Sequence, residues 1–572
     1  MKVAKIPRKW IGAKQNIEFA ADIAAHFEIH PMVARVLAGR FETMEGIEEF
    51  LHVNRDHLYH PMLMHDMEKA VKRIRKAIQH VERVLIVGDY DVDGVTATTI
   101  LVRTLESLNT NVSWYIPSRF TDGYGLHPGI VHRAHENGVS LIITVDNGIA
   151  SFDAVAKAKE LGIDLIITDH HHIGQDVPVA HAVVHPAYPR SMYPFKELCG
   201  AGVAFKLAQA LLGRLPEEYL DLVALGTVAD QVPLVRENRV LVKEGLALIN
   251  RGQMVKGLSA LVEVAGLSRQ RITSTEVAFR LAPRINAVGR LADASLAVEL
   301  LLADDPQKAA ELARTLHHYN ERRKSIQEEI EQQALGQIEA NPSWLNSRGL
   351  VVAGDDWHEG VIGIVAGHLT EWFYRPTLCI SVHKEQAKGS GRSVDDFDLY
   401  QTLDHVQQAA EVFSKWGGHA AAAGFSLPGE KIPLLRETMQ QVMDGYEDVK
   451  EELTPKIMAD AQLELGELSY QLIDDLKRLE PFGEGNSEPI FFIKNSKVSA
   501  VSTMGSTKHH LRVMVSENNR IGRTYPLIAF GEGENATQWK QTSTVHLLAT
   551  LNENVWEGQR SIQLMLVDAR FT

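Results

Sequence analysis

The stretch Val84–Gly94, which reads VLIVGDYDVDG, restricts the fold more than any other part of this 572-residue chain. Its apolar, β-branched beginning is typical of a short buried strand over Val84–Val87. Three aspartates follow at alternate positions, Asp89, Asp91 and Asp93, and Val95–Leu105 is predicted to be a helix. This order indicates the start of a doubly wound α/β domain, in which ligands bind at the carboxyl ends of the strands.

The three carboxylates repel one another unless a positive charge lies between them, and oxygen ligands suit Mg²⁺ or Mn²⁺. An Asp-x-Asp pair by itself is more often a solvated turn, so the spacing alone leaves both interpretations open. A calcium-binding EF-hand loop also begins D-x-D-x-D-G. That loop needs Glu at its twelfth position, where this chain has Ile100, so it is excluded.

Polar residues also follow each later strand of this region. The predicted strands are Val112–Ile116, Leu141–Val145, Leu165–Thr168 and Ala182–Val184, with helices such as Phe152–Leu161 between them. This rhythm favours a mostly parallel sheet covered on both faces. The residues after the four strands are, in order, Pro117-Ser118-Arg119, Asp146-Asn147-Gly148, Asp169-His170-His171-His172 and His185-Pro186. We therefore expect a metal site at this edge of the sheet.

Length and composition narrow the class of protein. The chain is too long for one core, and about three or four domains are expected. No run approaches the ~18 apolar residues of a membrane span, and the basic N-terminus lacks the apolar segment of a secretory signal. Two distant cysteines, Cys199 and Cys379, favour reduced thiols in a cytoplasmic protein. The net charge of −14 argues against indiscriminate coating of nucleic acid but allows a local basic channel.

Three features follow the first sheet. Asp230 ends a predicted helix, Tyr219–Ala229, where an aspartate is usually a cap but could here be a further metal ligand. Leu281–Leu291 is interpreted as a loop that carries Arg284, Asn286 and Arg290. Arginines at this density suit phosphate, although surface ion pairs fit nearly as well. Asp305-Pro306 is typical of a helix start.

The C-terminal half predicts a second α/β region and then a barrel. Strands at Leu350–Ala353 and Thr377–Ser381 flank a helix, Ile362–Leu369. Two glycine-rich segments, 388–393 and 417–425, are interpreted as phosphate-binding loops, although neither matches a Walker A motif. From about residue 456, five strands suit an OB-fold: Ile490–Ile493, His510–Val515, Tyr525–Phe530, Val545–Leu551 and Ser561–Val567. Lys494, Lys497, Lys508 and Arg512 would supply its basic groove.

The motifs GDYDVDG, VDNG, TDHHH and GTVADQVP resemble the DHH phosphoesterase superfamily. With PSRFTDGYGL, APRINAVGRL, SGRS, GGHAAAAGF and EPFGEGNSEPIF, the resemblance narrows to the RecJ family of bacterial single-strand DNA exonucleases. It extends in the expected order from about residue 80 to the C-terminus. It implies an α/β, two-lobed DHH core followed by an OB-fold β-barrel.

The resemblance also implies roles for residues. Two Mn²⁺ or Mg²⁺ ions would be bound by Asp91, Asp93, Asp146, His170 and Asp230. His171 would face the scissile phosphate, and Asp89 would be a further ligand or a neighbour of the ligands, whereas His172 would be structural. The terminal 5′-phosphate would contact Arg119, Ser390 and Arg392, with Tyr124 stacking on a base and His419 contacting phosphate. Arg284, Asn286 and Arg290 complete the candidate substrate contacts.

The chain is accordingly predicted to degrade single-stranded DNA from its 5′ end to mononucleotides in recombination and repair. The polarity and two possible partners, a single-strand-binding protein and a RecQ-type helicase, rest on the resemblance alone. Two other functions stay open: a phosphodiesterase or pyrophosphatase for short or cyclic nucleotides, and a non-catalytic single-strand-binding scaffold. We expect a monomer that does not enter a membrane.

The predicted domains follow from these patterns. They are an N-terminal helical segment (1–75), a DHH catalytic domain with a helical extension (76–304), a connecting long helix (305–340), a DHH-associated second lobe (341–450) and an OB-fold nucleic-acid-binding domain (451–572).

Overall fold

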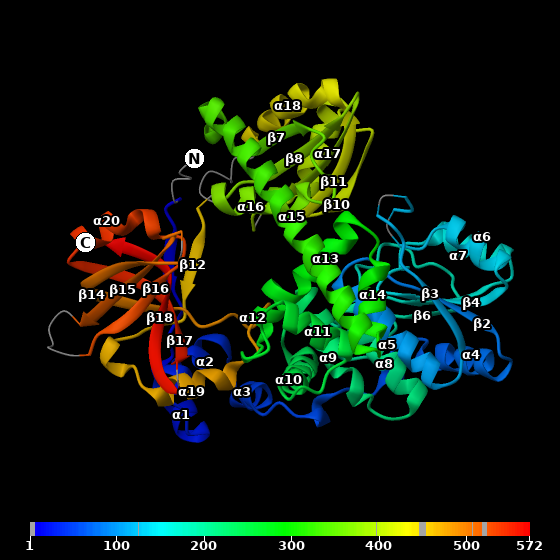
Figure 1. Ribbon diagram of the computed structural model, residues 1–572, viewed down its shortest axis with the longest axis horizontal. Helices are drawn as coiled ribbons and strands as arrows, with labels where there is room; N and C mark the ends of the chain where they lie inside the picture. Colours follow the sequence, from blue (N-terminus) through cyan, green and yellow to red (C-terminus); the bar gives the residue numbers. More distant parts are fainter. Residues whose placement is uncertain are drawn as a thin grey trace. The chain divides into compact units, whose positions relative to one another are not determined.

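The structure is a computed structural model that describes residues 6–119, 121–123, 125–395, 397–445, 454–505, 507–517, 523–556 and 558–572. The chain divides into two compact units, whose elements are labelled in Figure 1. The larger unit comprises residues 10–282, 298–309 and 458–572. The smaller unit comprises residues 1–9, 283–297 and 310–457.

A five-stranded parallel sheet forms the centre of the larger unit. Its strands are β2 (Arg83–Val87), β3 (Asn111–Tyr115), β4 (Val139–Val145), β5 (Asp164–Thr168) and β6 (Ala182–Val184). Their order in the sheet is β3-β2-β4-β5-β6, and every pairing is parallel. The strand order reverses beside β2 and β4, which is the point where doubly wound sheets bind their ligands. The predicted strands and the α/β class are confirmed.

Helices cover this sheet. They are α4 (Met67–Gln79), α5 (Val92–Ser107), α6 (Pro128–Glu136), α7 (Phe152–Glu160), α8 (Gly200–Leu212) and α9 (Leu220–Ala229), followed by α10 (Arg236–Asn250), α11 (Lys256–Val264) and α12 (Ser274–Glu276). One core joins α6 and α7 to alternate strand residues such as Ile142 and Ile167. Helices α5 and α8 pack against each other and against β4. The helix α5 begins three residues before its predicted start because the Asp91 side chain caps it.

The C-terminal strands close into a barrel. The strands are β13 (Ala461–Gln462), β14 (Phe491–Met504), β15 (His510–Glu517), β16 (Tyr525–Ala529), β17 (Thr544–Trp556) and β18 (Gln559–Phe571). The sheet order is β13-β14-β15-β16-β18-β17, and a pairing of β14 with β17 closes five of them into a ring. The parallel contact of β16 with β18 completes the circuit. The expected barrel is therefore present, with α19 (Tyr470–Leu476) before it and α20 (Ala536–Gln541) before β17.

The N-terminal helices share the core of this barrel. They are α1 (Ile17–Phe27), α2 (Pro31–Arg40) and α3 (Met44–Leu51), followed by two 3-10 turns, η1 (Arg55–His57) and η2 (Pro61–Leu63). Ile23, Leu37 and Phe50 from these helices are buried in one cluster with Phe491 and Leu547 of the barrel. The predicted N-terminal helical segment also contains a strand, β1 (Lys9–Gly12), which pairs with β12 (Lys456–Ala459).

The smaller unit contains a mixed sheet with the order β10-β11-β9-β8-β7. Its elements are β7 (Leu350–Asp355), α16 (Ile362–Phe373), β8 (Thr377–His383), β9 (Gln386–Arg392), α17 (Leu399–Ala410), β10 (Lys415–His419), β11 (Ala422–Pro428) and α18 (Ile432–Asp444). The prediction of two glycine-rich loops is wrong for the first segment, which lies in β9 up to Arg392, and holds in the second only for the turn at residues 420–421 between β10 and β11. One reason is packing: a Cβ on Gly389 would lie 2.1 Å from the Phe425 ring, so the glycine lets that ring cover the strand.

The arginine-rich segment is helical. A π-helical turn, η4 (Val277–Leu281), leads into α13 (Ala282–Leu291), so the predicted loop is wrong. Pro283 does not break the helix because the π-helical turn directly before it, in which the Ala282 N–H donates to the Val277 carbonyl, already departs from the regular hydrogen-bond pattern. After α14 (Ser295–Leu302), the long helix α15 (Pro306–Ala340) begins at the predicted proline. Among the described helices, α15 included, none combines the length and the apolar character of a membrane span.

Candidate metal centre

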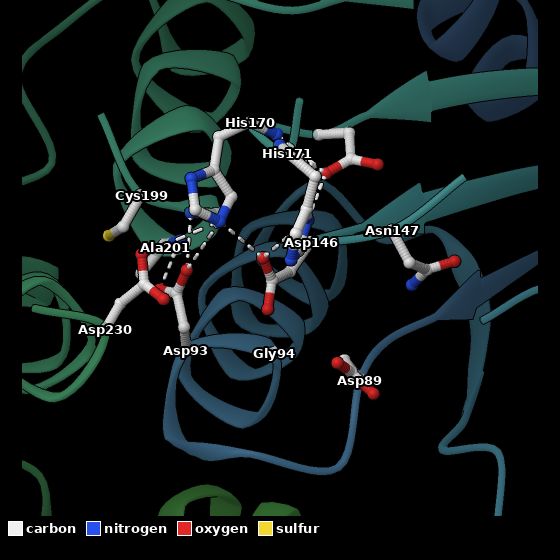
Figure 2. A network of polar contacts seen from close by, with 12 residues as sticks. Asp89, Asp93, Gly94, Asp146, Asn147, His170, His171, Cys199, Ala201 and Asp230 are labelled. Carbon is white, nitrogen blue, oxygen red and sulfur yellow. Dashed lines mark hydrogen bonds and ion pairs between the residues drawn. The ribbon is translucent and has the colours of Figure 1, made fainter. Parts of the chain in front are cut away.

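Three carboxylates converge on one nitrogen of His170 at the carboxyl ends of β2, β4 and β5 (Figure 2). The His170 Nε2 atom lies 3.1 Å from Asp146 Oδ1, 3.6 Å from Asp230 Oδ2 and 3.7 Å from Asp93 Oδ2. Asp93 and Asp146 are almost completely buried. Four predicted metal ligands from four different elements are thus brought together.

Two helix N-termini hold the aspartates that follow β2. Asp91 caps α5 and accepts a hydrogen bond of 3.1 Å from the Gly94 N–H. Asp93 in the first turn accepts two hydrogen bonds from the beginning of α8, at 2.5 Å from Gly200 N and 2.8 Å from Ala201 N. Amides and the partial positive charge of a helix N-terminus stabilise carboxylates. Both side chains are therefore fixed before any ligand binds.

Close packing fixes the third carboxylate. A Cβ on Gly200 would lie 2.5 Å from the Asp146 Cβ and 2.6 Å from its Oδ1, and a Cβ on Gly226 would lie 2.8 Å from Asp93 Oδ1. Asp146 itself has a left-handed backbone with φ of 61°, which aspartate tolerates better than most residues. Its N–H donates to the Thr168 carbonyl, which ties the end of β4 to β5.

The carboxylates raise one another's pKa values. Burial, followed by the charges of Asp93 and Asp91, raises the pKa of Asp146 well above its usual value. Burial and the charges of Asp93 and Asp91 likewise raise the pKa of Asp230 to about 9. Burial and a neighbouring aspartate raise the pKa values of Asp89 and Asp91 as well. So much negative charge in a buried site requires a cation for all groups to be ionised together.

The donor set fits such a cation. Asp146 Oδ1 and His170 Nε2 are buried, and neither makes a hydrogen bond with the described residues although they face each other. Within the described ranges of the chain, donor atoms fall into three groups in which all atoms lie within 4.8 Å of one another. The groups are Asp93–His170–Asp230, Asp89–Asp91–Asp146 and Asp146–His170–His171. The first two groups share no residue, which suits two ions, and oxygen with imidazole nitrogen suits Mn²⁺ or Mg²⁺.

The two adjacent histidines have opposite electrostatics. Burial lowers the pKa of His170, which keeps a neutral ring with a lone pair for a metal. His171 Nδ1 lies 2.7 Å from Asp169 Oδ1. Although burial lowers it, this hydrogen bond and the charge of Asp169 raise the pKa of His171 to about 9. Asp169 is buried, which raises its own pKa, but its bonds with His171 and with the Ile149 N–H lower that pKa to about 2.

Asp89 and Arg119 lie at the side of this centre. Asp89 is buried, and the charge of Arg119 is close enough to lower its pKa against the larger effect of burial. The Arg119 guanidinium carbon lies 4.3 Å from the centroid of the Tyr90 ring. Tyr124 lies outside the described residues, and His172 is exposed.

The remaining predicted substrate contacts lie in the smaller unit. Register places Arg392 of β9 opposite Ala422 of β11 and Ala422 opposite His419 of β10, so these three side chains share one face. Arg392 donates to Ser390 Oγ at 3.2 Å. Gly417 pairs with Gly424, and Gly424 pairs with Ser390 on the next strand. A Cβ added to either glycine would have no neighbouring atom within 4 Å. The face between Ser390, Arg392 and His419 is therefore open at its backbone.

The three residues predicted from α13 differ in their exposure. Arg284 is buried, whereas Arg290 is partly exposed and donates to the Gly360 carbonyl at 3.1 Å. Asn286 is also partly exposed.

Sequence reasoning assigned no role to several residues of the centre. Asp169 stands in the same DHH triplet, but only its bond to His171 shows that it orients and charges that ring. The role of the Gly200 and Ala201 amides could not be predicted from the sequence, because nearly every residue has such a group and only the structure shows that these two donate to Asp93. Tyr90 stands between Asp89 and Asp91 in the sequence, and nothing in that position indicated a role for its ring.

Comparisons with known proteins agree with this geometry. The sequence matches the DHH family, N-terminal domain over residues 83–227, the DHHA1 domain over 346–445 and the RecJ OB domain over 459–568. It is 37% identical to the single-stranded-DNA-specific exonuclease RecJ of Bacillus subtilis, over 98% of this chain and 70% of that protein. Against RecJ of Escherichia coli the identity is 33%, over 97% of this chain and 98% of that protein. The chain belongs to the RecJ family.

A solved RecJ structure has the same fold. The crystal structure of RecJ from Thermus thermophilus in complex with Mn²⁺ superimposes with a TM-score of 0.82 at 31% identity, covering 99% of this chain and 80% of that one. RecJ of the same organism in complex with Mg²⁺ gives a TM-score of 0.77. Both metals named in these RecJ structures are those that suit the donor set of this chain.

Proposed function

We propose that the chain is a metal-dependent exonuclease specific for single-stranded DNA, which hydrolyses phosphodiester bonds from the 5′ end to release mononucleotides. The observation that carries the proposal is the convergence of Asp93, Asp146 and Asp230 on His170 Nε2. Two of the facing atoms make no hydrogen bond with any residue that the structure describes. The names of the RecJ relatives supply the substrate class.

The residues would divide the work as follows. Asp93, His170 and Asp230 would hold one ion, and Asp91 and Asp146, with Asp89, would hold the other. When bound, Mn²⁺ or Mg²⁺ supplies a Lewis acid that polarises the phosphate and lowers the pKa of a coordinated water. Asp169 fixes the His171 ring through Nδ1, and the ring so oriented would face a phosphate oxygen. A His171 with a raised pKa would carry positive charge there and balance the charge that develops on the phosphoryl group.

The 5′ polarity would come from recognition of the terminal phosphate. We assign this role to Arg119 in the larger unit and to Ser390, Arg392 and His419 on one face of the smaller unit. The open backbone at Gly417 and Gly424 would let a phosphate approach closely. Tyr124, Arg284, Asn286 and Arg290 stay proposed substrate contacts.

The barrel would bind the single strand at a distance from the chemistry. Phe530 is an exposed aromatic residue at the end of β16, and its ring packs edge-on against His510 at 5.1 Å. Lys508 and Arg512 belong to the same hairpin region. Aromatic and basic residues together suit stacking bases and a DNA backbone. On this proposal residues 76–304 perform hydrolysis, residues 305–340 connect the lobes, 341–450 hold the terminus and 451–572 bind the strand, with 1–75 supporting it.

The deciding experiment is degradation of a single-stranded oligonucleotide labelled at either the 5′ or the 3′ end, with Mn²⁺ or Mg²⁺ added to the full chain. The 5′ label should appear in mononucleotides first. Asp93→Asn should abolish this release, because it weakens the charge that holds the metal. Asp153→Asn, an exposed aspartate in the first turn of α7, is the matched control and should be fully active.

Three outcomes would contradict the proposal: degradation from the 3′ end, full activity of Asp93→Asn, or faster turnover of dinucleotides than of long strands. The last result would indicate a phosphodiesterase for short nucleotides instead. Binding of DNA without any metal-dependent turnover would indicate a scaffold.

We also propose that the protein acts as a monomer in the cytoplasm, together with a single-strand-binding protein and a RecQ-type helicase. Family membership is the support for these partners. Sedimentation of the full chain, alone and with each candidate partner, tests the oligomeric state and the two interactions.

A further inference from the structure

Arg119 directly follows Ser118, which is hydrogen-bonded to Asp122. The Asp122 carboxylate accepts hydrogen bonds from the Ser118 N–H at 3.0 Å and from the Tyr115 hydroxyl at 2.7 Å. The Asp122 and Gly123 N–H groups both donate back to the Ser118 carbonyl. Arg133 adds an ion pair of 3.5 Å with Asp122. Ser118, which directly precedes Arg119, is therefore tied through Asp122 to the end of β3 and to α6.

The Arg119 side chain then lies over Tyr90, which stands between two candidate metal ligands. The guanidinium carbon is 4.3 Å from the ring centroid. This distance is well inside the range of about 6 Å in which a cation is attracted by an aromatic face. A planar guanidinium on a ring keeps its donors in one plane, with their edge available to an anion.

That edge retains hydrogen-bonding capacity. Arg119 Nε is buried and makes no hydrogen bond with the described residues. The charge of Arg119 also reaches Asp89, which lies next to Tyr90 in the sequence. A guanidinium held beside the metal centre, with a buried donor still to satisfy, is placed to receive a phosphate oxygen.

We infer that Tyr90 is a positioning residue whose ring holds the Arg119 guanidinium in the orientation that receives the terminal 5′-phosphate of the DNA. This inference rests on the proposed function. Tyr90 does not touch the reacting atoms and acts through Arg119. The tyrosine of the GDYDVDG motif therefore couples the metal-binding loop to recognition of the strand terminus.

The test compares steady-state kinetics on a single-stranded oligonucleotide with a 5′-phosphate and on the same strand with a 5′-hydroxyl. Tyr90→Leu should raise KM about tenfold on the phosphorylated strand, within the range of a cation–π contact, and leave kcat within about twofold. On the 5′-hydroxyl strand its KM should match that of the wild type. Tyr90→Phe, which keeps the ring, should restore most of the affinity.

A double-mutant cycle with Arg119→Ala provides the decisive readout. The double variant should bind the phosphorylated strand no more weakly than Arg119→Ala alone. Mn²⁺ titration of Tyr90→Leu should give the wild-type affinity, which separates positioning from collapse of the loop. Tyr188→Leu, which removes a ring stacked on His65 elsewhere in the same unit, is the matched control.

Additive losses in the cycle, an equal rise of KM on both strands, or weakened Mn²⁺ binding would each overturn the inference. A wild-type protein that degrades neither strand would instead overturn the proposed function, so the two failures are distinguishable.

Discussion

At the residue scale, the buried carboxylates of the larger unit differ in what neutralises them. Asp146 and Asp230 have raised pKa values because burial and neighbouring aspartates disfavour the charged form. Asp169 is equally buried, yet its pKa is about 2 because His171 pairs with it. No cation or carboxylate of the described residues is in hydrogen-bond contact with Asp221; the Leu222 and Val255 N–H groups donate to it. The pKa of Asp221 therefore shows the effect of burial on a carboxyl that lies outside the metal centre.

Asp221 should make the free energy of unfolding depend on pH. Burial raises the pKa of its carboxyl to about 6, above the usual value of the unfolded chain, so the folded state holds an extra proton between about pH 4 and pH 6. This contribution to stability is present below about pH 4 and is lost as the pH rises to about 6. Urea unfolding of Asp221→Asn should show a smaller loss over this window, by about 2 kcal/mol.

A parallel pH profile of the variant and the wild type would contradict the role of Asp221. If Asp221→Asn and the wild type lose stability in parallel between pH 4 and pH 6, the carboxyl titrates normally. Asp176→Asn, an exposed aspartate in the loop before β6, is the matched control and should leave the profile unchanged.

At the scale of elements, the metal centre depends on two helix N-termini that meet. Asp91 caps α5, whereas Asp93 in the same helix is held by the first amides of α8. The two helices pack against each other over much of their length, which fixes this meeting point. Gly200 permits it, since any side chain there would occupy the place of the Asp146 carboxylate.

Gly200→Ala should therefore weaken metal binding through displacement of Asp146. The expected loss of Mn²⁺ affinity is about 10- to 100-fold, the range found when a group that orients a ligand is changed. Calorimetric titration with Mn²⁺ measures it. Gly202→Ala in the same helix turn would meet only the Leu198 side chain, at 3.2 Å, and should bind Mn²⁺ nearly normally. Equal affinities of the two variants would contradict the role of Gly200.

At the scale of the whole molecule, the larger unit is assembled from segments that are far apart in the chain. The N-terminal helices and the barrel form one core. Arg239 links this core to α10, which packs against α9, the helix that ends at Asp230. Its guanidinium lies 3.9 Å from the Phe50 ring centroid and donates to the carbonyls of Phe50, Leu479 and Arg478. These carbonyls stand at the ends of α3 and of the turn after α19, where helix ends need donors.

Arg239→Met should destabilise the larger unit, because it removes the Arg239 donors from the carbonyls of Phe50 and Arg478 and one of the two donors of the Leu479 carbonyl, which Asn486 also binds. A loss of about 2–4 kcal/mol is expected. Hydrogen exchange read by mass spectrometry on the full chain should show faster exchange in α3 and in residues 477–482. Arg251→Met, an exposed arginine at the end of α10, is the control. Unchanged exchange in both segments would show that other contacts hold them.

The sequence by itself determined the parallel sheet, the barrel and the place of the metal centre. Alternating strands and helices with polar residues after each strand suffice, because parallel strands bring their carboxyl ends to one edge. Asp93, Asp146 and His170 could be selected in this way although they are far apart in the chain. The start of α15 at Pro306 was equally local, since a cap and a proline define it.

Only the tertiary structure decided which groups support those ligands. The arginine-rich segment proved helical and the glycine-rich segments proved to lie mostly in strands, because pairing and packing with distant elements override local composition. The contacts of Asp93 with the α8 amides, of Gly200 with Asp146 and of Tyr90 with Arg119 each join residues separated by many positions. Such contacts leave no periodic pattern in a single sequence, so candidate metal ligands could be proposed from the sequence whereas the groups that support them could not.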